Sequence, residues 1–127
     1  MAGLAIDRDG VGFSVDEGRP RAIDLAFLAR QTMGNKNLEN DILQLYRKQL
    51  RKFEPDWAKA KSLPNLEITI HGMRSAALGV GATSIAELSR SAEQELRQNG
   101  TQMGEIYAQL GDAVRVALEF IDQILGE

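Results

Sequence analysis

Cysteine is absent from this sequence, and histidine and tryptophan occur once each. The lack of cysteine excludes disulfides, thiolate metal sites and cysteine nucleophiles. It is also usual for proteins kept in a reducing cytoplasm, and we therefore expect a cytoplasmic protein. No cluster of metal-ligating side chains accompanies the single histidine, so we expect the chain to bind no metal ion and no other cofactor.

Long apolar runs and an excess of positive charge are missing as well. A membrane-spanning helix needs about 18 or more consecutive apolar residues, and residues 1–10 lack the basic region and apolar run of a secretory signal. The chain has 15 Lys and Arg residues against 18 Asp and Glu residues, a net charge of -3. Because this field repels a phosphate backbone, we expect neither a membrane nor a nucleic acid as a partner.

What the sequence does contain is typical of a helical domain. Its 127 residues suit one domain with its own core, and it is rich in Ala, Leu, Glu, Gln and Arg, which helices tolerate well. Glycines are frequent in residues 1–20, which show no sustained helical period. We therefore expect a flexible N-terminal tail over residues 1–20 and a helical domain over residues 21–127.

Apolar residues recur every three or four positions in five segments of this domain, which predicts five helices. The first is short and covers about residues 22–33, with Asp24 near its start, where a carboxylate suits the helix dipole. The second is long, starts after caps near Asn35 and extends to about Ala60. Since its apolar period continues on both sides of Pro55, we expect a kink there and no break.

The other three predicted helices follow after short connections. Ser62 can cap the third, with Pro64 in its first turn. Residues 79–84 interrupt the pattern before a fourth helix that ends at residues 99–100, and Thr101 can cap the last one. Four sizeable amphipathic helices joined in this way predict an all-α fold, an antiparallel up-down four-helix bundle with the short N-terminal helix over one end.

The third predicted helix has two different faces, since successive helical residues are about 100° apart. Its apolar stripe consists of Leu66, Ile70, Met73, Ala77 and Val80. A second face carries Glu67, His71, Arg74, Ser75 and Leu78. His71 is therefore predicted to point outward from the helix.

His71 is chemically suited to act as a nucleophile, because a neutral imidazole has a free lone pair on one ring nitrogen. Arg74 follows one turn later and can offset the charge of a phosphate. The surface around the histidine is kept low by small residues, namely Gly72, Ser75, Ala76 and Gly79. A flat and accessible histidine favours a macromolecular partner.

This stretch resembles the signature of bacterial histidine-containing phosphotransfer domains, or HPt domains. In that family a phosphorylated histidine is followed by leucine, lysine and glycine, then by a Gly-Ala turn, apolar positions and a glutamate. The matching residues here are His71, Met73, Arg74, Gly81, Ala82, Ile85, Leu88 and Glu93. The resemblance extends over about residues 22–125, and its main departure is Ser75, which stands where the family usually has glycine.

The resemblance implies a phosphorelay intermediate. A receiver domain's phospho-aspartate would pass its phosphoryl group to His71, which would pass it to the aspartate of a second receiver. The implied partners are response-regulator receiver domains and a hybrid histidine kinase, with Mg²⁺ expected on the receiver. The chain itself would be a monomer and a phosphoryl-group carrier without ATP-dependent kinase activity.

The resemblance also assigns roles to individual residues. His71 is the nucleophile and carrier, and Arg74 is the charge stabiliser. Glu93 is a residue that can orient the imidazole across a pair of helices. The residues assigned to the docking surface are Glu67, Ile68, Ser75 and Leu78.

Two other functions stand beside phosphotransfer. The first is a four-helix adaptor that is not phosphorylated and binds receiver or kinase domains through the same surface. The second is an enzyme that uses His71 as an acid or base on a small molecule. A shallow face, and the lack of paired carboxylates or a metal cluster beside the histidine, argue against the enzyme.

Overall fold

The computed structural model describes residues 21–59, 63–99 and 104–126, and every regular element within these ranges is an α-helix. The expected tail over residues 1–20 and the caps expected at Ser62 and Thr101 lie outside the described residues. The all-α prediction is confirmed over the described part of the chain. The five helices are α1 (Leu25–Gln31), α2 (Lys36–Lys59), α3 (Leu63–Val80), α4 (Thr83–Asn99) and α5 (Gly104–Leu125).

The first helix is shorter than the segment of residues 22–33 expected from its apolar pattern. The Asp24 carboxylate accepts a hydrogen bond from the backbone N–H of Phe27 at 3.0 Å, so Asp24 caps the helix and the residues before it lie outside. At the other end, Met33 and Gly34 have positive φ angles of 54° and 76°. This left-handed pair ends the helix and turns the chain into α2.

The second helix begins where the sequence predicts. The Asn35 side chain accepts a hydrogen bond from the backbone N–H of Leu38 at 3.1 Å, which satisfies a free donor of the first turn. The helix continues without interruption past Pro55 as far as Lys59. The expectation that Pro55 does not break the helix is confirmed.

The connection between α3 and α4 is tighter than expected. Residues 79–84 were predicted to interrupt the helical pattern, but α3 extends to Val80 and α4 already begins at Thr83. Gly81 makes this possible because its φ angle is +84°, and the N–H groups of Gly81 and Ala82 both donate to the Ala77 carbonyl, at 3.0 and 2.9 Å. A single left-handed glycine thus replaces a longer loop.

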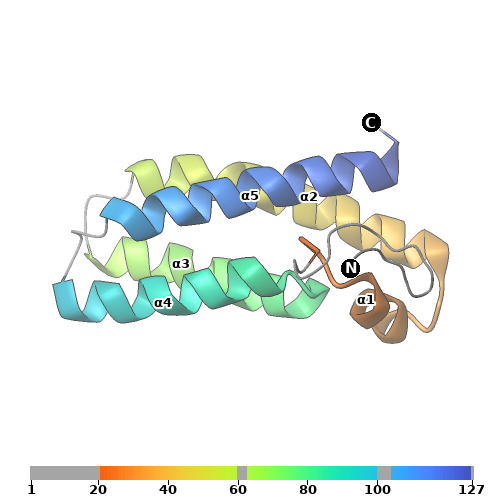
Figure 1. Ribbon diagram of the computed structural model, residues 1–127, viewed down its shortest axis with the longest axis horizontal. Helices are drawn as coiled ribbons and strands as arrows, with labels where there is room; N and C mark the ends of the chain where they lie inside the picture. Colours follow the sequence, from red (N-terminus) through yellow and green to blue (C-terminus); the bar gives the residue numbers. More distant parts are fainter. Residues whose placement is uncertain (1–20, 60–62, 100–103, 127) are drawn as a thin grey trace, which may run out of the picture.

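The four long helices form a closed set of contacts, in which α3 packs on α2 and α4, and α5 also packs on α2 and α4. They lie side by side along the long axis of the molecule (Figure 1). Between α2 and α5, Arg47 Nη1 donates to Asp122 Oδ1 at 3.0 Å. No helix among the described residues is long and apolar enough to cross a membrane.

The short helix α1 lies at one end of the long helices (Figure 1). It contacts α2, and the backbone N–H of Asp24 donates to the Gly81 carbonyl at 2.9 Å. The turn that joins α3 to α4 is therefore held by the residues that cap α1.

The core confirms the predicted stripe of α3, whose members Leu66, Ile70, Met73, Ala77 and Val80 are all buried. Tyr46 of α2 is also buried and Tyr107 of α5 is half-buried, so both are packing residues. The interior also contains apolar residues of every other helix, including Leu28, Leu43, Leu50, Ile85, Ala92, Leu96, Leu110, Val114 and Ile121. With α3 anchored in this way, its opposite face is left to solvent.

Candidate functional site

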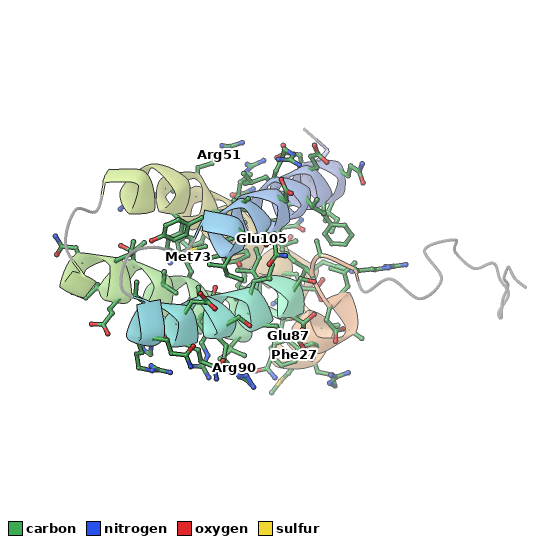
Figure 2. The ribbon with its side chains drawn as sticks, turned by 60° about the vertical axis from the view of Figure 1, so that its left-hand side comes forward. Phe27, Arg51, Met73, Glu87, Arg90 and Glu105 are labelled. Atoms are coloured by element: carbon green, nitrogen blue, oxygen red, sulfur yellow. The ribbon has the colours of Figure 1, made fainter. Side chains whose placement is uncertain are left out.

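His71 lies on the solvent side of α3, with its side chain 67% exposed. Its neighbour Ile70 is fully buried, and so is Met73, which points into the interior of the molecule (Figure 2). The residues that flank the histidine along the chain therefore fix how the helix is rotated, and this rotation places the imidazole at the surface.

One carboxylate from the neighbouring helix binds two residues of α3. Glu93 of α4 places Oε2 3.0 Å from Nδ1 of His71, and its Oε1 accepts a hydrogen bond from Nη1 of Arg74 at 2.9 Å. The Glu93 side chain is only 14% exposed, whereas that of Arg74 is 37% exposed. The histidine and the arginine, which are three positions apart on α3, are thus joined through a residue 19 to 22 positions away in the chain.

The charge of Glu93 follows from these contacts. Burial raises the pKa of the carboxyl, but the hydrogen bonds from His71 and Arg74 and the charges of both side chains lower it by more. The pKa of Glu93 is therefore lower than that of an ordinary glutamate, and the group is an ionised carboxylate at neutral pH.

This ionisation determines which nitrogen of His71 is free. A carboxylate can only accept hydrogen bonds, so the Nδ1 atom in contact with Glu93 must carry the proton. In the neutral ring the lone pair then lies on Nε2. The contact selects one tautomer and one ring orientation, and it leaves the exposed histidine with a single nucleophilic atom.

A cleft of about 540 Å³ opens beside the histidine between α3 and α4. The cleft is wide open to solvent, which agrees with the shallow face expected from the sequence. It is lined by Glu67, Ile68, His71, Gly72, Glu93 and Arg97. Both helices contribute to it, and the glycine next to the histidine carries no side chain that could fill it.

The four predicted docking residues are all exposed, but only two of them line the cleft. Ile68 is 71% exposed and Leu78 is 56% exposed, so both apolar side chains are open to solvent. Glu67 and Ile68 lie in the cleft wall, whereas Ser75 and Leu78 lie farther along α3 toward the turn at Gly81. The docking surface named from the sequence is thus a strip along α3 with the histidine in its middle.

Sequence reasoning missed Arg97 and the partner of Arg74. Arg97 is exposed and follows Glu93 by four residues on α4, a spacing typical of an ion pair within a helix. The sequence spacing thus predicts that Glu93 pairs with Arg97 on its own helix. In the structure, Glu93 instead contacts His71 and Arg74 of α3. Arg97 therefore faces the cleft without its expected partner.

No group of three or more potential metal ligands occurs among the described residues. Comparison of the chain with models of protein families, with curated proteins and with solved structures found no match.

Proposed function

We propose that this chain is a histidine phosphotransfer protein of a two-component phosphorelay. The observation that supports it most directly is the contact between Glu93 and Nδ1 of His71, which leaves Nε2 as a nucleophile on an open surface. We further propose that the four long helices form an antiparallel up-down bundle with α1 over one end, and that the protein is a cytoplasmic monomer. The contacts of each long helix with two others agree with such a bundle.

The proposed reaction is a transfer between two side chains. The Nε2 lone pair of His71 forms a bond to phosphorus as the bond between phosphorus and the receiver's aspartate oxygen breaks, and the electrons of that bond return to the aspartate. The ring then carries a positive charge that is shared with the Nδ1–H group. Glu93 lies 3.0 Å from this nitrogen, so its carboxylate stabilises the charge that the transfer creates. The return step to a second receiver reverses each change.

Arg74 supports the same reaction in two ways. Its Nη1 atom holds Oε1 of Glu93, which keeps the other oxygen directed at the imidazole. It also brings a positive charge within one helical turn of the phosphorylated ring. We therefore retain Arg74 as a charge stabiliser and add a positioning role through Glu93.

The partner proposed for this surface is a response-regulator receiver domain, supplied by a hybrid histidine kinase upstream and by a regulator downstream. The receiver would contribute the aspartate and the Mg²⁺ ion that the transfer requires. Ile68 and Leu78 present exposed apolar side chains on either side of His71, where a docked receiver would cover them. The low surface at Gly72 and Ser75 leaves room for close approach.

The test is incubation of the chain with phosphorylated receivers and Mg²⁺. We expect an acid-labile phosphoryl group on His71 and its loss in a His71→Gln variant that folds normally. ATP alone should label neither protein. If no receiver among those encoded with the chain transfers a phosphoryl group, the relay is wrong, and receiver binding that persists in His71→Gln would identify the adaptor instead.

A further inference from the structure

Two charged side chains line the cleft beside His71 without an ion-pair partner among the described residues. They are Glu67 of α3 and Arg97 of α4. Glu93 lines the cleft as well, but its two oxygens are already bound by His71 and Arg74. The positive charge of Arg74 is thus largely balanced by Glu93, whereas the charge of Arg97 remains available.

A phosphoryl group on Nε2 would add up to two negative charges to this cleft. Arg74 cannot balance them fully without weakening its bond to Glu93, because one of its nitrogens is held there at 2.9 Å. Arg97 lines the same cleft as the histidine and is free to turn toward the phosphoryl oxygens. A guanidinium suits this task because its planar N–H groups can bind two such oxygens together.

We propose that Arg97 binds the phosphoryl group on His71 directly and adds to the nearby charge of Arg74, one nitrogen of which is held by Glu93. This inference rests on the proposed phosphorylation of His71 and names a specific residue for it. Glu67 lies on the other wall of the cleft. The negative charge of Glu67 repels the phosphoryl oxygens and so counteracts the effect of Arg97. The balance between these two side chains sets the charge state of the phosphorylated histidine.

The experiment uses phosphoramidate, a small phosphodonor that phosphorylates histidine without any receiver. In that reaction the P–N bond of the donor breaks as the bond from phosphorus to Nε2 forms, and the donor nitrogen, already protonated in phosphoramidate, leaves as ammonia with the electron pair. The second ionisation of the phosphoryl group is then followed by ³¹P NMR as the pH is varied. Wild type, Arg97→Gln and Arg97→Lys are compared.

We expect Arg97→Gln to raise the measured pKa of the phosphoryl group by about half a unit, because a nearby cation favours the dianion. Arg97→Lys should restore most of the wild-type value. Glu67→Gln should shift the value in the opposite direction, since it removes a negative charge from the same cleft.

Arg90 provides the matched control. It lies on the same face of α4 and is exposed like Arg97, but it is seven residues, about two helical turns, earlier and does not line the cleft. Arg90→Gln should leave the phosphoryl titration unchanged. A wild-type titration in Arg97→Gln, or an equal shift in Arg90→Gln, would overturn the proposal.

The same samples separate this inference from the proposed relay. If phosphoramidate labels His71 and Arg97→Gln shifts the titration, the role of Arg97 stands even where no receiver exchanges phosphate with the chain. If receivers exchange phosphate but the titration is insensitive to Arg97, the relay stands and the assignment of Arg97 is wrong. A chain that phosphoramidate does not label at His71 would overturn the assignment as well.

Discussion

Glu93 of α4 holds His71 of α3 with 3.0 Å between its Oε2 atom and Nδ1 of the imidazole. The two residues are 22 positions apart in the chain and meet only because α3 and α4 pack closely along their length. The tautomer of the single histidine is thus determined by the packing of two helices. Any reaction at the ring depends on the preservation of this contact.

Removal of the Glu93 carboxylate is expected to slow phosphorylation of His71. In Glu93→Ala, the Nδ1 atom loses its acceptor, so the ring can rotate and either nitrogen can hold the lone pair. We expect the rate of transfer from a phosphorylated receiver to fall by about tenfold. We also expect phosphate on both ring nitrogens, where wild type should carry it on Nε2 alone, and ³¹P NMR of the product distinguishes the two isomers.

Two further variants show whether the effect comes from the contact itself. Glu93→Gln keeps an oxygen acceptor for Nδ1 without the charge, so it should recover the preference for Nε2 and only part of the rate. Glu87→Ala removes an exposed carboxylate from the same helix that does not line the cleft, and should behave as wild type. An unchanged isomer ratio in Glu93→Ala would contradict the proposed positioning.

The lowered pKa of Glu93 makes its contribution to stability depend on pH. Burial raises this pKa and the contacts with His71 and Arg74 lower it by more, so the folded state holds the proton less tightly than the unfolded chain does. The stabilisation is fully present above the ordinary glutamate pKa of about 4.3. It is lost as the pH falls through the lower pKa of the folded state.

This dependence is measurable by urea unfolding of wild type and Glu93→Gln. The difference in free energy of unfolding between the two proteins should be largest near about pH 6 and should shrink toward about pH 3. Arg74→Gln should reduce the difference at the higher pH, because Arg74 donates one of the hydrogen bonds that lower this pKa. A difference that stays constant across the range would show that the carboxylate is not stabilised by its contacts.

The rotation of α3 could be predicted from the sequence because it depends on local pattern. The stripe from Leu66 to Val80 contains only apolar residues, and burying it leaves one orientation for His71. The extent of α1 could not be predicted in the same way. Its ends are set by the Asp24 side chain and by two left-handed residues, and apolar spacing carries no information about either.

The cleft was also beyond prediction from the sequence. Its walls come from two helices, and the direction of Glu93 depends on competition between Arg97 on its own helix and Arg74 across the interface. Both partners lie at plausible spacings in the sequence. Only the packing of α3 against α4 decides between them, because it brings the His71 ring to the same carboxylate.

The turn at Gly81 offers a test of how the site is supported. Gly81 has a φ angle of +84°, and a Cβ atom there would lie 2.9 Å from Cδ2 of Phe27 and 3.2 Å from the Asp24 carbonyl oxygen. Gly81→Ala is therefore expected to destabilise the protein by about 1 to 3 kcal/mol. Thermal or urea unfolding measures the loss.

Gly79→Ala provides the opposite control two residues earlier. Gly79 is within α3, and a Cβ atom there would meet nothing within 4 Å. This substitution should stabilise the protein by about 0.5 to 1 kcal/mol, because alanine loses less backbone entropy in a helix. Equal effects at the two glycines would show that the left-handed turn is not required.

Ser75 separates docking of a receiver from the chemistry at His71. It is exposed on α3, one turn after the histidine, and lies outside the cleft. A long side chain in Ser75→Gln should keep a receiver from approaching closely, and the rate of transfer should fall by about tenfold to a hundredfold because the reacting atoms are held too far apart. Phosphorylation by phosphoramidate should be unchanged, since this small donor does not cover the helix surface.

The same change at an exposed site of α5, Ala108→Gln, should affect neither reaction. If Ser75→Gln transferred phosphate at the wild-type rate, the receiver would have to approach His71 from the side of the cleft, over Ile68 and Arg97, and the strip toward Leu78 would not be part of the interface.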